Sequence, residues 1–165
     1  MDAAQALLMG VDKEKTSHSF YSEASQTCRD EAGKRMFAAL ADIELGHVRY
    51  LQALYSGLTS DGTWQLSAVE KVPACPTDIS RPDLFPCAPA EEQKCETIED
   101  DLAILDSAIQ REQSAHSFYL DVAKNVEDPT GRGVFEYLAD DEVAHERILR
   151  EARKHLAETG TWHRS

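Results

Sequence analysis

The chain contains one set of metal-ligand side chains twice. Two glutamates and a histidine recur 98 residues later with every internal spacing kept: Glu14, Glu44 and His47, then Glu112, Glu142 and His145. Carboxylates and imidazoles are costly to bury unless something pairs with them, and these six stand at core-type positions of amphipathic stretches. A shared partner is therefore indicated, and a pair of metal ions is the natural one.

The charge of this set fits two metal ions better than one. Four carboxylates within a few ångströms would repel one another, and without cations several would stay protonated. Two divalent ions neutralise them, and imidazole nitrogen suits iron. We therefore predict a site for two iron ions, with manganese or zinc as alternative metals.

The two Glu-x-x-His pairs make this prediction specific. Residues three apart are neighbours on one helix face, so a Glu and a His at that spacing reach the same point. One such pair is near chance in a chain with so many glutamates, but two share the register of the repeat. We assign bridging and catalytic roles to Glu44 and Glu142, terminal roles to the other two glutamates, and one metal to each histidine. The competing reading places these side chains on solvated helix faces.

Tyrosines and further histidines follow the single glutamate of each half. Tyr21 and Tyr119 come seven residues after it. They either hydrogen-bond a ligand carboxylate and tune the reactive site, which would place them among the catalytic residues, or only pack in the core. His18 and His116 come four residues after the same glutamates, and are extra ligands, supporting partners or surface residues.

The repeat extends well beyond the candidate ligands. Residues 7–51 and 105–149 align without a gap and share 16 identities in 45 positions, which indicates a duplicated unit. Apolar residues in both copies follow alternating steps of three and four, the spacing of one helix face, and each copy breaks at an Asp that suits a helix N-cap. Each copy is therefore predicted to be a helical hairpin. The predicted helices span residues 2–27, 31–56, 98–126 and 129–157.

The short loops within each copy make its two helices antiparallel. The single Glu lies about 14 residues before the loop and the paired Glu about 14 after it, so both stand about 21 Å from the turn at the helical rise per residue. The repeat gives the second hairpin the same geometry. All six candidate ligands are therefore predicted to meet near mid-height of a bundle.

Residues 57–97 join the two hairpins and hold five of the six prolines. A connector this long can run the length of a bundle, so that the third helix starts at the far end from where the second stops. Trp64 and Phe85 are expected to pin it to the bundle. The predicted fold is all-α: a four-helix bundle of two duplicated hairpins, 1–56 and 98–157, in one domain of 165 residues.

Composition narrows the possible functions. The net charge is −13, from 30 acidic and 17 basic residues, which argues against nucleic acid and anionic membranes as partners. No stretch approaches the roughly 18 apolar residues of a membrane helix, and the N-terminus lacks a signal-peptide pattern, so a cytoplasmic location is expected.

The cysteines form no C-x-x-C pair, which argues against a rubredoxin-like site. The sequence leaves open the roles of the four cysteines, Cys28, Cys75, Cys87 and Cys95.

The stretches from Glu14 to Tyr21 and from Phe37 to His47, with their counterparts in the second half, resemble the rubrerythrin-like branch of the ferritin-like superfamily. The similarity covers nearly everything except the connector. It implies a di-iron carboxylate bundle and a homodimer. Activities known in that superfamily are peroxide reduction, oxidation of ferrous iron by dioxygen, and hydroxylation of substrates.

The sequence departs from rubrerythrins in two ways. Ala115 stands where rubrerythrins carry a further ligand Glu, and the chain has no rubredoxin-like domain. The six-residue set is closer to that of bacterioferritins. Leu45 replaces their haem-ligating Met, so no haem of that kind is expected.

The leading interpretation is a non-haem di-iron oxidoreductase that reacts with hydrogen peroxide or dioxygen, as in oxidative-stress defence, and takes electrons from an external donor. Three alternatives stay open: ferroxidase activity with iron handling, hydroxylation of an organic substrate, and a non-catalytic metal-binding bundle. A cage-sized assembly would favour the first, an apolar substrate channel the second, and bound zinc without oxygen reactivity the third.

Overall fold

The computed structural model describes residues 2–64, 66 and 98–162, and these form four helices. The all-α bundle of two hairpins is confirmed. None of the described helices carries the long apolar stretch that crossing a lipid bilayer requires. The helices are α1 (Ala3–Thr27), α2 (Glu31–Asp61), α3 (Ile98–Asn125) and α4 (Pro129–Thr159).

Aspartates begin the second helix of each hairpin, as the sequence predicted. The Asp30 carboxylate accepts a hydrogen bond from an amide of the first turn of α2 at 2.7 Å. Asp128 does the same for two amides of α4, at 2.8 and 2.9 Å. These contacts satisfy amide groups that have no partner within the helix. The loops between paired helices are only a few residues long, because α2 begins soon after Thr27 and α4 soon after Asn125.

The second helix runs further than predicted. It was expected to end near residue 56 but continues to Asp61. Gly57, where the connector was predicted to begin, is a buried residue inside this helix. The helix ends instead at Gly62, whose φ of 66° is a left-handed conformation that favours glycine.

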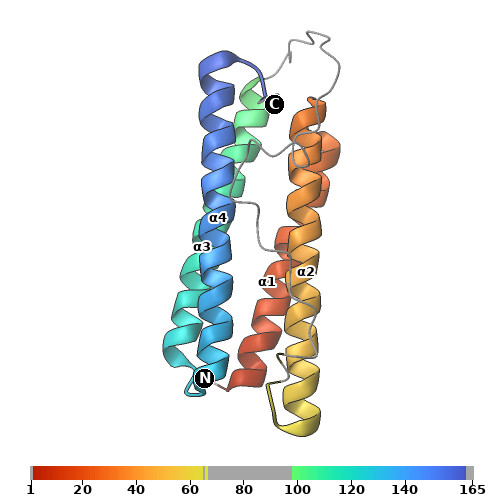
Figure 1. The fold of residues 1–165 in the computed structure, drawn as a ribbon. Coiled ribbons are helices and arrows are strands. Elements are labelled where there is room, and N and C mark those ends of the chain that lie inside the picture. The colour runs from red at the N-terminus through yellow and green to blue at the C-terminus, as the bar shows by residue number, and fades with distance from the viewer. Residues whose placement is uncertain (1, 65, 67–97, 163–165) are drawn as a thin grey trace.

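The two hairpins lie side by side, and α2 ends at the opposite end of the bundle from the start of α3 (Figure 1). Trp64, just beyond α2, packs against Gly131 in the first turn of α4. Ile98, at the start of α3, lies instead beside Gly160 at the far end of α4. The third helix thus starts at the far end from where the second stops, as predicted, and Trp64 contacts the bundle as expected. Phe85 falls outside the described residues.

The apolar core is divided into two clusters along the bundle axis, and the candidate ligands lie between them. On α1, for example, Val11 belongs to one cluster and Tyr21 to the other, with Glu14 between them. Each ligand position is therefore closed off from both ends by packed side chains. The largest members are Trp162, Tyr21 and Phe37 in one cluster, and Tyr119 and Phe135 in the other.

Two helical glycines offer a test of this packing. A Cβ on Gly33 would meet the Cys28 sulfur and stand 2.8 Å from the Trp162 ring, whereas one on Gly133 would meet nothing within 4 Å. Gly33→Ala should therefore lower the free energy of unfolding by about 1–3 kcal/mol. Gly133→Ala should raise it by up to about 1 kcal/mol through helix propensity. Urea unfolding of the metal-free variants measures both, and equal stabilities would contradict the packing at Gly33.

Candidate metal centre

The structure brings the six candidate ligands together in the interior of the bundle. The three residues of each half come from both helices of its hairpin, and every side chain is at most 1% exposed. The competing reading, in which these residues face solvent, is therefore wrong. Unneutralised, such a set would be very costly to bury. The residues are Glu14, Glu44, His47, Glu112, Glu142 and His145.

The ligand atoms form two overlapping groups of four, and within each group they lie within 4.8 Å of one another. Glu44 and Glu142 belong to both groups. One group is completed by Glu14 and His47, and the other by the corresponding glutamate and histidine of the second half. Two positions that share two carboxylates are what a pair of bridged metal ions requires, so the grouping favours the predicted bridging roles.

Several buried polar atoms in this cluster have no hydrogen-bond partner. They include both carboxylate oxygens of Glu44, Oε2 of Glu14, Oε2 of Glu112, Oε1 of Glu142 and Nδ1 of His47. A buried acceptor without a donor is destabilising by roughly 1–3 kcal/mol. Oxygen and imidazole donors aimed at one interior point suit divalent cations, and the residues present therefore fit a two-metal site.

Burial and neighbouring charges shift the pKa values of this cluster in opposite directions. Burial, together with the adjacent Glu44, raises the pKa of Glu14 to about 8. Burial and the charges of Glu44 and Glu112 raise the pKa of Glu142 well above its ordinary value. Burial alone would raise the pKa of Glu44, but the adjacent Glu14 carboxyl and both histidines hold it well below the ordinary value. In the metal-free protein, Glu14 and Glu142 therefore hold protons beside the ionised carboxylate of Glu44.

The two predicted tyrosines reach across the bundle to the single glutamate of the other half. The hydroxyl of Tyr21 donates to Oε1 of Glu112, and that of Tyr119 donates to Oε1 of Glu14. Both tyrosines are fully buried. Each hydrogen bond holds one carboxylate oxygen, so the other oxygen, Oε2, is left for a metal ion.

His18 and His116 do not join either group of ligand atoms. Their Nδ1 atoms instead donate to the backbone carbonyls of Ala41 and Ala139, at 2.9 and 3.0 Å. Each histidine therefore links the two helices of its own hairpin. Of the three readings left open, the structure supports a structural partner and not an extra ligand.

Asp141 is a residue of the site that the sequence did not single out. Its Oδ2 accepts a hydrogen bond from Nε2 of His47 at 2.9 Å, while Nδ1 of the same ring lies 3.4 Å from oxygens of both Glu14 and Glu44. Burial disfavours the charged ring, but these three carboxylates raise the pKa of His47 well above its ordinary value. A carboxylate on the far nitrogen fixes the ring orientation of a metal-binding histidine. The signal in the sequence was a break in the repeat, since the equivalent position is Ile43.

Removing this contact should weaken metal binding. Asp141→Ala is expected to lower the affinity for divalent metal by about 10–100-fold, because His47 loses the group that orients it. Asp140→Ala is the matched control, since Asp140 is the exposed neighbour and its removal changes the net charge equally. Competition with a chelator measures both affinities. Equal losses would mean that only the overall charge matters.

The cysteines contribute nothing to this centre within the described residues. Cys28 is buried in the apolar core. Burial and the nearby Asp101 raise its pKa above the ordinary value, which keeps the thiol protonated and unreactive. Cys75, Cys87 and Cys95 lie outside the described residues.

Comparisons with known proteins agree with the fold. The family model described as rubrerythrin matches residues 103–161, which cover most of the second hairpin. A solved structure of a hypothetical protein from Pyrococcus furiosus is similar over 98% of this chain and 94% of that chain, with a TM-score of 0.68 and 25% identity. A comparison with curated proteins finds no match.

Proposed function

We propose that this rubrerythrin-like protein, a helical bundle of the ferritin-like kind, is a non-haem di-iron redox protein that reacts with hydrogen peroxide or dioxygen. The observation that carries the proposal is the pair of overlapping buried donor groups that share Glu44 and Glu142. When bound, two ferrous ions supply the two electrons that reduce an O–O bond. Manganese or zinc would suit the same ligands, and iron is favoured by the matched family.

The residues around the centre hold the ligands in place and limit the access of water to the bound metals. Tyr21 and Tyr119 hold the terminal carboxylates in place, and their hydroxyl protons lie within reach of the same oxygens. The two apolar clusters keep bulk water away from both ends of the site. Ala115 is buried and supplies no seventh donor. The donor set is thus three side chains from each half.

Turnover under this proposal needs a separate reductant. The sequence contains no C-x-x-C pair that would hold a rubredoxin-like iron, and the buried Cys28 thiol is shielded from exchange. An external electron donor would therefore return the centre to its ferrous form. The physiological role that fits this cycle is the removal of peroxide or dioxygen in oxidative-stress defence.

Anaerobic titration tests the proposed reaction. Protein loaded with two ferrous ions should be oxidised by one equivalent of hydrogen peroxide per pair, since each ion gives one electron, and optical absorption follows the change. Dioxygen is tested in the same way, and zinc-loaded protein is the redox-inert control. If neither oxidant reacts with the bound iron faster than with iron in buffer, the redox proposal fails and a metal-stabilised bundle becomes the better reading.

Size-exclusion chromatography separates this proposal from iron storage. A rubrerythrin-like oxidase needs only a small assembly such as a homodimer, whereas storage of mineral needs a hollow cage of many chains. We expect an elution volume of a dimer. Elution at the size of a cage would favour ferroxidase activity with iron storage instead.

A further inference from the structure

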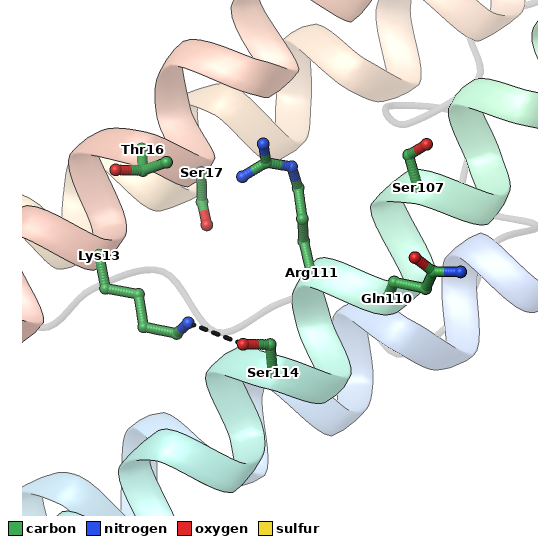
Figure 2. A pocket seen from close by; sticks show the side chains of 7 residues that line it. All are labelled: Lys13, Thr16, Ser17, Ser107, Gln110, Arg111 and Ser114. Atoms are coloured by element: carbon green, nitrogen blue, oxygen red, sulfur yellow. Dashed lines mark hydrogen bonds between the residues drawn. The ribbon is translucent and has the colours of Figure 1, made fainter.

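A polar pocket lies between α1 and α3, the two helices that carry Glu14 and Glu112 (Figure 2). Its volume is about 420 Å³, which is within the range of pockets that hold small organic molecules. Two cations, four hydroxyl groups and one amide line it, and no carboxylate does. This lining differs in sign from the rest of a chain whose net charge is −13.

The two cations occupy equivalent positions of the repeat and approach the pocket from opposite sides. Lys13 extends from α1 toward α3, where its Nζ donates to Oγ of Ser114 at 3.2 Å. Arg111 extends from α3 toward α1 (Figure 2). Within the part of the chain that the structure describes, neither forms an ion pair with a carboxylate. Their charges are therefore available to a ligand.

Aromatic rings hold both cations in these positions. Nζ of Lys13 lies 5.5 Å from the centre of the Phe118 ring, and Cζ of Arg111 lies 4.4 Å from that of Phe20. Each ring belongs to the helix opposite its cation. Such contacts are favourable at partly exposed sites, and they leave N–H groups free to donate. The pocket thus has its donors placed before any ligand arrives.

A buried hydroxyl adds a further donor. Ser17 is 6% exposed and lines the pocket between the two cations (Figure 2). Its hydroxyl makes no hydrogen bond with any residue that the structure describes. The hydroxyl is therefore able to donate to an oxygen of a ligand in the pocket.

We propose that this pocket binds a small organic oxyanion, either a phosphate ester or a carboxylate. Charge-assisted hydrogen bonds from Lys13 and Arg111 would hold its oxygens, the hydroxyl groups would donate to the same oxygens, and the volume leaves room for a carbon skeleton. The proposal does not depend on which metal the neighbouring centre holds. It places an anionic ligand on the same helix turns as Glu14 and Glu112.

Packing alone is the competing explanation for these side chains. The aliphatic stems of lysine and arginine often cover aromatic surface while the charge stays in water. Under that explanation the charge itself has no function. Methionine variants separate the two readings, because methionine keeps an unbranched apolar stem over the ring and lacks the charge.

The test is isothermal titration of the full-length protein, as purified, with glycerol 3-phosphate and with succinate. Inorganic phosphate shows whether the carbon skeleton matters, and glycerol at the same ionic strength is the uncharged control. Lys13→Met and Arg111→Met should each raise the dissociation constant of the bound probe about tenfold or more. Lys15→Met, which removes an exposed charge on the same helix, should change it less than about twofold. Lys13→Arg should restore most of the affinity.

Each result of these titrations supports or contradicts the proposed anion pocket. Preference for glycerol 3-phosphate or for succinate identifies the source of the oxyanion. Binding that weakens with added salt and is lost in Lys13→Met and Arg111→Met supports the pocket. No measurable binding of either organic probe, or equal binding by both methionine variants and the wild type, overturns the proposal whatever the metal centre does. Circular dichroism and thermal unfolding confirm that the variants are folded.

Discussion

Glu44→Gln should remove most of the metal from the protein. Glu44 is fully buried and is one of only two residues that belong to both groups of ligand atoms, so its loss takes a charged donor from both metal positions at once. The loss of affinity should exceed the 10–100-fold that follows the removal of a partner that only orients a ligand. Elemental analysis after equilibration with a chelator should find well under one iron per chain.

The controls for this variant use the symmetry of the site. Glutamine has the shape of glutamate, so the fold should survive, and circular dichroism checks it. Glu136→Gln changes the charge equally at an exposed position of α4 and should keep the metal. His145→Ala removes a donor from one group only and should retain at most one ion tightly. A Glu44→Gln protein that holds two irons and turns over fully would refute the ligand assignment.

The metal-free protein should lose stability as pH rises from about 5 to about 8. The pKa of Glu14 is 4.5 in the unfolded chain and about 8 in the folded one, so across this window the folded state holds a proton that the unfolded state has released. Rising pH therefore favours unfolding. The raised pKa values of Glu142 and His47 act with the same sign. For Glu14 alone, the free energy of unfolding should fall by on the order of 4 kcal/mol over these three pH units.

Bound metal should weaken or reverse this dependence of stability on pH. Metal ions bind the deprotonated ligands, so affinity rises with pH and binding releases protons. At a fixed excess of metal the melting temperature should fall less over the same window, or rise. Calorimetric titration at pH 7 in two buffers of different ionisation enthalpy counts the released protons.

A substitution at Glu14 provides the matched control for the pH dependence. Glu14→Gln is permanently neutral, so the metal-free variant should show a flatter profile and be more stable than the wild type at pH 8. A metal-free wild type whose melting temperature rises between pH 5 and pH 8 would contradict the protonation of this cluster. Dialysis against chelator before each measurement excludes residual metal as the cause.

Most of the fold could be predicted from the sequence because its signals are local. The aspartates that cap α2 and α4 stand at chain breaks, and the three-and-four spacing of apolar residues defines one face of each helix. The single clear error was the end of α2. The connector was predicted to begin at residue 57, but Gly57 is buried within α2 and the helix continues to Asp61.

The candidate ligand set could also be predicted from the sequence alone. A helix rises by a constant amount per residue, so equal distances from a short loop place Glu14 and Glu44 at the same height, and the repeat does the same for the second half. Helical periodicity further requires Glu44 and His47 to share a face. These are properties of single helices and short loops, and they hold however the hairpins are docked.

Only the tertiary structure decided which side chains touch across helices. Three features depend on helix rotation and spacing and on side-chain rotamers: the hydrogen bond from His47 to Asp141, the tyrosines that reach the opposite glutamates, and the placement of Lys13 and Arg111 on opposite sides of one pocket. Periodicity assigns a residue to a face but not to a partner on another helix. The sequence thus determined what gathers at mid-height of the bundle, and packing between hairpins decided how those groups are held and what lies beside them.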